Sequence, residues 1–491
     1  QENEIFISEI IEMGDKFLAE NEDLFIQRYK SIGPDDYANI SYTSGTTADP
    51  KGILLTHRNY TANVEQAHSV IGVDETDKML IILPLDHCFA HVAGFYTMMS
   101  YGASIGTVPS GKSGKEALRN ISPSIQELKP NVMLSVPTLA KNFKKSIETA
   151  IKKKGATVEK LYNFALNNAI AYYKEGYNKG TQFVDIFRWP LVKLFDKLVF
   201  SSVRQGLGGK MKFFVGGGAL LDIDLQKYYN AIGIPMYQGY GLSEATPIIS
   251  ANSEAKHIFG SSGKVVSPME IKILDADGVE QPFGVKGEIC IKGENVMAGY
   301  WKNPKSTADT IVDGWLHTGD MGYMRDEEML YVVGRFKSLL IAADGEKYSP
   351  EGIEENLVES SKYIDGALLH NSQDPYTIAL ITPNKEALKA YAKEQGLDPE
   401  SKEAKVKMLE LLQDEVNMYR KGGRLYGAFP ERWLPAAVCV LPEPWTEQNH
   451  FLNSSMKVVR GRIEEAYKAH MEFAYTPEGK NIVNEMNLAS L

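Results

Sequence analysis

The chain has 491 residues, of which 43% are hydrophobic and 24% are charged. This length predicts two or more domains, and the composition excludes a disordered, collagenous or disulfide-rich protein. The 53 basic and 63 acidic residues give a net charge of -10, which argues against a nucleic-acid partner.

The predicted elements begin with one or two amphipathic helices, because apolar residues recur at helical spacing over residues 5–29. Short strands follow over 40–42 and 53–55, on either side of a loop of small, hydroxylated and turn-forming residues. Farther along, strand-like runs alternate with helical stretches, which is typical of a doubly wound α/β domain with a largely parallel sheet. These runs cover residues 78–83, 132–136, 212–215 and 235–237.

Three later segments complete the expected organisation. Residues 141–204 are helical in character with basic and aromatic residues, and indicate either an inserted helical layer with a solvated basic face or a membrane-surface or lipid-entry element. Residues 252–333 predict a small β-rich subdomain, with strands at 270–274 and 287–292. We place a hinge after this subdomain, at residues 334–337, so that residues 1–336 form an N-terminal domain and residues 337–491 form a smaller, mobile α+β domain.

The sequence also bears on the compartment. No apolar run approaches the roughly 18 to 20 residues needed to cross a bilayer. Residues 1–20 are acidic and are not a signal peptide, and the chain starts at Gln1 without an initiator Met, so we consider a natural start farther upstream. Cys88, Cys290 and Cys439 are far apart, which supports neither a disulfide framework nor a zinc site. We expect a cytoplasmic protein, with peripheral membrane contact as a further hypothesis.

The loop over residues 43–52 offers hydroxyls, backbone amides and one lysine, which together suit a polyphosphate. The GxxxxGK[ST] order is absent, which excludes a P-loop NTPase. A solvent loop of Ser, Thr and Gly is the alternative for this segment taken alone.

The string YTSGTTADPKG, residues 42–52, resembles the phosphate loop of the adenylate-forming enzymes, a superfamily of acyl-CoA synthetases, peptide-synthetase adenylation domains and luciferases. Ala48 replaces one glycine of the pattern and resists positive φ, which bears on loop mobility without removing a ligand. The resemblance implies that nucleotide phosphates are bound by Thr43, Ser44, Gly45, Thr46, Thr47 and Lys51.

Two further motifs carry the resemblance at the nucleotide. GYGLSE, residues 239–244, resembles the motif in which an aromatic residue lies against adenine, a hydroxyl meets the α-phosphate and a Glu helps to hold Mg²⁺. By position these are Tyr240, next to Gly241, then Ser243 and Glu244, and a hard divalent cation prefers carboxylate oxygen. GGGA, residues 216–219, is similar to the glycine turn beside adenine and includes Gly217 and Gly218, although a glycine run alone is weak evidence.

The remaining motifs follow in the family's order. WLHTGD, residues 315–320, resembles the segment whose Asp accepts both ribose hydroxyls, which implies this role for Asp320. GRFK, residues 334–337, is similar to the hinge motif, with Arg335 near the ribose and phosphates and Lys337 as the pivot. Gly345 lies in a loop that resembles the lining of the pantetheine tunnel. LNSSMK, residues 452–457, resembles the motif of the catalytic lysine, Lys457, whose charge would assist the carboxylate that approaches the α-phosphate.

The motifs together span about residues 35–462 and look most like those of long-chain fatty acyl-CoA synthetases. Amino-acid activating domains carry an acidic residue that pairs with the substrate amine, and no such residue is evident after His87. By resemblance, His87 lies near the acyl carboxylate, and a purely structural role is nearly as good an explanation for this histidine. The resemblance implies an α/β fold with a large adenylation domain, and a fatty acid, ATP, Mg²⁺ and CoA as partners. The products would be acyl-CoA, AMP and pyrophosphate, formed through acyl-AMP.

Several alternatives stay open. The chain could be an acyl-AMP ligase, or a medium-chain or aryl-CoA ligase, because motifs do not report pocket shape. Members of the resembled family have a much longer region before the phosphate loop, so this chain is a fragment or a variant, or another chain supplies that layer. A catalytically impaired nucleotide- or lipid-binding relative is therefore the alternative of a different class.

Overall fold

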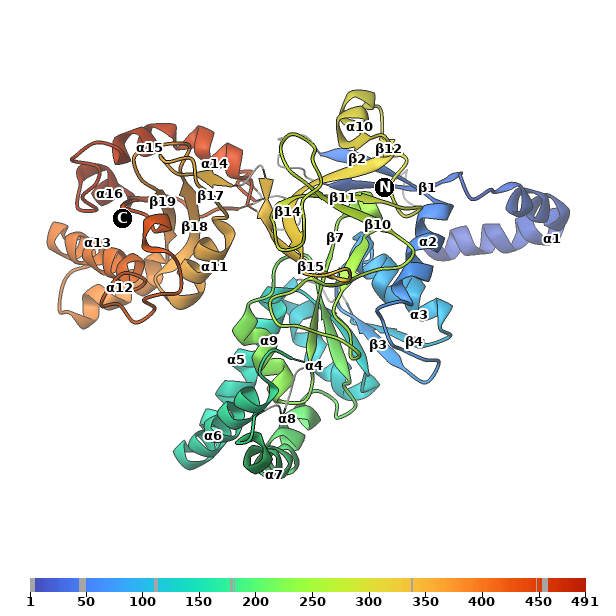
Figure 1. The fold of residues 1–491 in the computed structure, drawn as a ribbon, viewed down its shortest axis with the longest axis horizontal. Coiled ribbons are helices and arrows are strands. Elements are labelled where there is room, and N and C mark those ends of the chain that lie inside the picture. Colours follow the sequence, from blue (N-terminus) through green and yellow to red (C-terminus); the bar gives the residue numbers. More distant parts are fainter. Residues whose placement is uncertain are drawn as a thin grey trace.

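The computed structural model describes residues 5–43, 50–109, 114–176, 180, 182–336, 339–446, 448–452 and 458–491. It has a large mixed sheet with flanking helices and a smaller C-terminal domain that forms a lobe of its own (Figure 1). The predicted α/β fold with a small second domain is therefore confirmed. The boundary at residues 336 and 337 and the mobility of the C-terminal domain stay predictions. In the described part of the chain, no helix combines the length and the apolar character that a membrane span requires.

Helix α1 (Ile7–Ser31) confirms the helix predicted at the N-terminus and protrudes from the body of the molecule (Figure 1). Its periodic apolar residues face solvent, with exposed fractions of 50% for Ile10 and 54% for Phe25. Strands β1 (Tyr37–Thr43) and β2 (Lys51–Thr56) follow as an antiparallel pair and confirm the two predicted short strands. Thr43 pairs with Lys51, so the two ends of the predicted phosphate loop are neighbours.

The parallel part of the large sheet has the strand order β4-β3-β5-β6-β7. β3, β5, β6 and β7 confirm the four predicted runs, whereas β4 was not predicted. β5 and β6 are buried along their whole length, as expected for parallel strands covered on both faces. Their bounds are β3 (Lys78–Ile81), β4 (Ser104–Thr107), β5 (Val132–Ser135), β6 (Phe213–Gly216) and β7 (Met236–Gly241).

Strand β7 joins the parallel part to an antiparallel part. Its first residues pair with β6 in parallel, and from Gly239 it pairs with β8 (Ile248–Ala251) in antiparallel fashion. The predicted β-rich region thus continues the same hydrogen-bonded sheet. Its strands, in the order β9-β15-β14-β11-β10 with β13 on β14, are β9 (Gly263–Val265), β10 (Glu270–Leu274), β11 (Gly287–Lys292), β13 (Ile311–Val312), β14 (Trp315–Met324) and β15 (Met329–Arg335).

Helices cover the sheet, and β12 (Gly299–Tyr300) pairs with β2 in a separate small sheet. The predicted helical stretch at 141–204 is confirmed by α5 (Pro137–Lys153), α6 (Ala156–Tyr173), α7 (Asp185–Phe195), η2 (Asp196–Phe200) and α8 (Ser201–Gly206). The other helices before residue 336 are α2 (His57–Ala67), η1 (Phe89–Tyr96), α3 (Thr97–Ser100), α4 (Gly114–Leu128), α9 (Ile223–Ala231), η3 (Ser243–Ala245) and α10 (Pro304–Thr310).

The C-terminal domain has its own sheet and its own core. In the sheet, β19 pairs antiparallel with β18 and parallel with β20, and buried residues such as Leu369 and Ile381 pack against Leu409 of α13. Lys141 of α5 forms an ion pair with Glu359 of α11 in this domain. The elements are β16 (Leu340–Ile341), β17 (Lys347–Tyr348), α11 (Glu351–Ser360), β18 (Ile364–His370), β19 (Ile378–Pro383), α12 (Lys385–Glu394), α13 (Lys402–Asn417), η5 (Glu431–Trp433), β20 (Ala437–Val440), α14 (Arg460–Ala466), α15 (Lys468–Ala474) and α16 (Glu485–Ser490).

Candidate active site

Glycines leave the backbone without side chains at the ends of β6 and β7. A Cβ on Gly217 would lie 2.9 Å from the ring of Phe89, and a Cβ on Gly241 would overlap the carbonyl group of Pro247. Gly218 has a φ of +84°, a left-handed conformation that favours glycine. β6 and β7 are adjacent at the point where the sheet changes from parallel to antiparallel, and ligands of open α/β sheets bind at such points. The predicted adenine turn and the GYGLSE motif therefore meet at one edge.

Three predicted ribose and adenine residues contact one another. The Tyr240 hydroxyl donates to Asp320 Oδ2 at 2.7 Å, and Arg335 Nε lies 3.2 Å from Asp320 Oδ1. The register of β14 and β15 places Asp320 directly opposite Arg335. The structure thus brings together residues from β7, β14 and β15 that are distant in the sequence.

The charge state of this group follows from its burial. Burial raises the pKa of the Asp320 carboxyl, an effect that the Arg335 guanidinium and the Tyr240 hydroxyl oppose. Burial also raises the pKa of Tyr240 well above its ordinary value, with the nearby Asp320 adding to the shift, so the phenol stays protonated and donates. A buried carboxylate has acceptor positions for more than two donors, so Asp320 is suited to accept ligand hydroxyls as well.

Glu244 lies in the adjoining 3-10 turn η3 and contacts a residue that the sequence analysis did not single out. The Tyr300 hydroxyl donates to Glu244 Oε1 at 2.9 Å. The Lys51 ammonium lies 4.7 Å from the centre of the Tyr300 ring. Tyr300 therefore lies between the predicted magnesium ligand and the predicted phosphate-loop lysine. Burial, and Glu244 beside it, raise the pKa of Tyr300, which keeps its hydroxyl a donor.

A buried polar network holds η3 in place. Asn63 of α2 exchanges two hydrogen bonds with the backbone of Ile248, at 2.9 and 3.0 Å. Asn295 Nδ2 donates to the Ala245 carbonyl at 2.8 Å, and the Thr246 hydroxyl donates to the Asn295 carbonyl at 2.7 Å. Thr246 has a φ of +62°, which costs on the order of 1 kcal/mol or more for a β-branched residue and which these bonds offset. The sequence carried one unused signal for this network, the polar stripe of α2 formed by Asn59, Asn63 and Gln66.

The segment before η1 approaches the same region. The Cys88 thiol lies 3.6 Å from the Ser41 hydroxyl, and burial raises its pKa, with hydrogen bonds to Ser41 and Ser243 opposing the shift. His87 is exposed, and its Nδ1 accepts from the backbone N–H of Phe89 at 3.4 Å. Its predicted place near an acyl carboxylate stays a prediction, as do the roles of Ser243 and Glu244. The helix that follows, η1, is a π-helix, a rare form that is frequent at functional sites.

The remaining predicted residues are Gly345, Thr43 and six residues that the structure does not describe. Gly345 occupies the turn between β16 and β17, with a φ of +85°, and its N–H donates to the Ala342 carbonyl at 2.8 Å. Thr43 is described by its backbone in β1 only. Ser44, Gly45, Thr46, Thr47, Lys337 and Lys457 lie outside the described residues.

Comparisons with known proteins identify the family of the chain. Residues 7–301 match the model of a family described as AMP-binding enzyme. Fatty acyl-CoA synthetase B of Dictyostelium discoideum is 29% identical over 90% of this chain and 64% of its own length. Long-chain-fatty-acid–CoA ligase 1 of Cavia porcellus is 27% identical over 90% of this chain and 61% of its own length, so the chain spans less than two thirds of these relatives.

Among solved structures, the chain is similar in fold to O-succinylbenzoate coenzyme A synthetase from Bacillus subtilis in complex with AMP. The TM-score is 0.57 and the sequence identity 22%, with 88% of this chain and 70% of that chain covered.

Proposed function

The chain belongs to the AMP-binding enzyme family, and from this premise we propose that it is an acyl-CoA synthetase. The carboxylate of the acid attacks the α-phosphate of MgATP, which forms acyl-AMP and releases pyrophosphate. The CoA thiol then attacks the acyl carbonyl of acyl-AMP, which forms the thioester and releases AMP. The observation that carries the proposal is the contact of Tyr240 and Arg335 with Asp320, next to the Glu244–Tyr300–Lys51 group. These groups are of the types that bind a ribose, a magnesium ion and phosphates, which supports the proposal.

Each group has a proposed part in binding. Asp320 accepts the ribose hydroxyls, and Tyr240 with the bare backbone at Gly217 and Gly218 takes the adenine. Lys51 and the hydroxyls of residues 43–47 bind the phosphates. Glu244 suits Mg²⁺, because a carboxylate offers about four acceptor positions and Tyr300 takes one of them. The ion would neutralise phosphate charge as pyrophosphate leaves.

The C-terminal domain would supply Lys457 for the first half-reaction, and rotation at Lys337 would present the Gly345 loop for the second, with closure excluding water. Lys457→Ala is then expected to abolish acyl-AMP formation and largely to spare thioester formation from supplied acyl-AMP. Separate assays of the two half-reactions check this. Equal loss of both would refute the assignment.

We propose long-chain fatty acids as the substrates. The names of the two relatives support this, and so does a cavity of about 440 Å³ on the η1 side of the sheet, lined by Phe213, Val215 and Tyr237. A largely apolar cavity suits an alkyl chain. The experiment is pyrophosphate release from MgATP with acids of graded length, with and without CoA. Val215→Phe is expected to move the preferred acid to a shorter chain.

The outcomes separate the alternatives. CoA-stimulated release that is greatest with long acids supports the proposal. Release without CoA stimulation indicates an acyl-AMP ligase. A preference for aryl or medium-chain acids indicates an aryl-CoA or medium-chain acyl-CoA ligase, and the Bacillus subtilis synthetase of similar fold is named for an aryl acid. ATP binding without release for any acid indicates a catalytically impaired relative.

We also propose that the inserted helices contact an anionic membrane surface from the cytoplasmic side. Helices α6 and α7 lie together at one tip of the molecule (Figure 1). Large apolar side chains on α7 and next to it face solvent, with exposed fractions of 79% for Phe183, 65% for Phe187 and 63% for Leu198. Residues 152–200 contain nine basic and four acidic residues in a chain of net charge -10. Exposed aromatic groups among lysines suit the interface of anionic lipids.

Sedimentation with vesicles tests the membrane contact. We expect binding at low salt to vesicles of phosphatidylcholine with phosphatidylglycerol and weaker binding to phosphatidylcholine alone. Lys193→Glu with Lys197→Glu should weaken it. Lys402→Glu with Lys468→Glu, an equal change of charge at exposed sites of the C-terminal domain, is the matched control and should not. Absence of sedimentation with either vesicle would refute the contact.

A further inference from the structure

Strand β14 bulges at the point where it delivers Asp320 to the candidate active site. Across the β11–β14 ladder, Glu288 pairs with Met321 and Cys290 pairs with His317, so β14 advances four residues while β11 advances two. The extra length lies at Thr318, Gly319 and Asp320, and Gly319 has a left-handed φ of +70°. A bulge of this kind redirects the side chain that follows it. The direction of the Asp320 carboxylate therefore depends on how this bulge is held.

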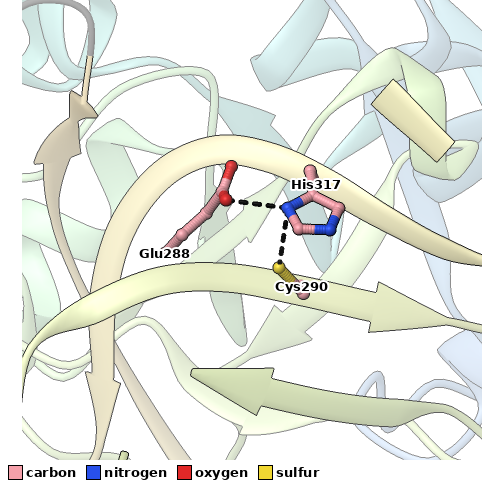
Figure 2. Close-up of side chains that lie close together, drawn as sticks. All are labelled: Glu288, Cys290 and His317. Carbon is pink, nitrogen blue, oxygen red and sulfur yellow. Dashed lines mark hydrogen bonds and ion pairs between the residues drawn. The ribbon is translucent and has the colours of Figure 1, made fainter. Parts of the chain in front are cut away.

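Glu288 holds the bulge from the neighbouring strand. Its Oε1 accepts from the backbone N–H of Gly319 at 3.0 Å, and its Oε2 lies 2.8 Å from His317 Nδ1 (Figure 2). One carboxylate thus contacts β14 at Gly319, within the bulge, and at His317, just before it. The Thr318 hydroxyl completes the attachment, because it donates to the Ile289 carbonyl at 2.8 Å and accepts from the N–H of Asp320 at 3.1 Å.

We infer that Glu288 and His317 are positioning residues that set the Asp320 carboxylate for the ribose hydroxyls. They act through Gly319 and Thr318 rather than by touching the nucleotide. The inference rests on the proposed function, since that function supplies the ribose. It gives a role to His317 within the Asp320 motif and adds Glu288 from another strand, and the two residues determine how strongly the site distinguishes a ribonucleotide from a deoxynucleotide.

A metal ion is the rival explanation, because ligand atoms of Glu288, Cys290 and His317 all lie within 4.8 Å of one another (Figure 2). The chemistry of the three groups favours hydrogen bonds instead. Cys290 is fully buried, and burial raises its thiol pKa to about 12, with Glu288 adding to the shift, whereas a metal binds the thiolate. Both oxygens of Glu288 already contact groups of β14, one at His317 and one at Gly319.

The test compares nucleotides as well as variants. The quantity is the ratio of kcat/KM for ATP to that for 2′-deoxy-ATP or 3′-deoxy-ATP, measured by fatty-acid-dependent pyrophosphate release. In the wild type we expect a ratio of about 10 to 100, as a hydrogen bond to a charged group contributes. Glu288→Ala is expected to reduce this ratio at least about fivefold and to raise KM for ATP, with KM for the fatty acid unchanged.

Conservative variants of Glu288 and His317 test whether the hydrogen-bonding groups set the nucleotide ratio, and a second disruptive variant, at His317, tests the same point independently of Glu288. Glu288→Gln keeps an acceptor for Gly319, and His317→Asn keeps a donor near the Nδ1 position, so both should retain the wild-type ratio. His317→Leu should lower the ratio without changing Glu288, which preserves the test if Glu288→Ala does not fold. Cys290→Ser is the matched control from the same cluster and should also retain it.

Two results would overturn the inference. One is a uniform loss of activity in Glu288→Ala and His317→Leu with the nucleotide ratio unchanged, which would indicate a merely structural role. The other is stoichiometric bound zinc in the wild type that disappears together with activity in Glu288→Ala, His317→Leu and Cys290→Ser. If the wild type releases no pyrophosphate with any acid, the proposed function fails instead. The same ratio is then measured as dissociation constants of the three nucleotides by calorimetry.

Discussion

Replacing Tyr300 with Phe removes one hydroxyl from the candidate active site and keeps the ring. That hydroxyl donates to Glu244 Oε1 at 2.9 Å. A hydrogen bond to a charged group contributes about 1.5–3 kcal/mol, and because Glu244 is only partly buried, water can replace part of the loss. We therefore expect about 1.5 kcal/mol, which corresponds to about tenfold. The ring that faces Lys51 at 4.7 Å remains in Tyr300→Phe and is lost in Tyr300→Leu.

The assay is fatty-acid-dependent pyrophosphate release as a function of Mg²⁺ concentration. Tyr300→Phe should raise the half-saturating Mg²⁺ concentration about tenfold, with KM for the fatty acid unchanged, because Glu244 loses the donor that orients it. Tyr300→Leu should in addition raise KM for ATP. Tyr467→Phe, which removes a hydroxyl that donates to Glu443 at 3.0 Å in the C-terminal domain, is the matched control and should leave both quantities unchanged. The reasoning is refuted if the Mg²⁺ dependence of Tyr300→Phe equals that of the wild type.

Three further predictions concern stability and reactivity. Burial raises the folded-state pKa of Asp320, so its ionised form costs stability at neutral pH. Asp320→Asn should therefore match or exceed the wild-type Tm at pH 7 and lose this advantage as the pH falls and the wild-type carboxyl protonates, which thermal scans across pH will show. The same variant should raise KM for ATP about tenfold in steady-state kinetics. Gly241→Ala should destabilise by about 1–3 kcal/mol in urea titrations, because its Cβ overlaps the Pro247 carbonyl, whereas Gly206→Ala, with open space in a helix, should not destabilise. Burial raises the pKa of Cys88 and raises the pKa values of Cys290 and Cys439 to about 12. An aromatic disulfide reagent should therefore label the native protein at least about 100-fold more slowly than the denatured protein. Fast labelling of the native protein would contradict the burial of the three thiols.

The sequence alone determined the elements whose signal is local. Residues 132–136 and 212–215 read as strands because parallel strands covered on both faces need continuous apolar runs, and β5 and β6 are buried accordingly. The helices at 141–204 and the strands at 270–274 and 287–292 were likewise predictable from periodicity and turns. Tyr240, Asp320 and Arg335 were identified through motif resemblance, and the structure places them in contact.

Only the tertiary structure decided the contacts between distant elements. Periodicity showed that α1 has an apolar stripe, but it could not show that this stripe lies exposed. Likewise, turn signals showed a β-rich region, but not that β7 joins it to the parallel sheet. Glu288 meets the bulge of β14 through the register of β11 and β14, and a one-residue slip would turn its side chain to the other face of the sheet. Tyr300 of β12 meets Glu244 of η3 although the two elements are not paired in a sheet. Such pairs leave no local pattern, because the spacing of each partner is set by its own element and their meeting is set by how the elements pack.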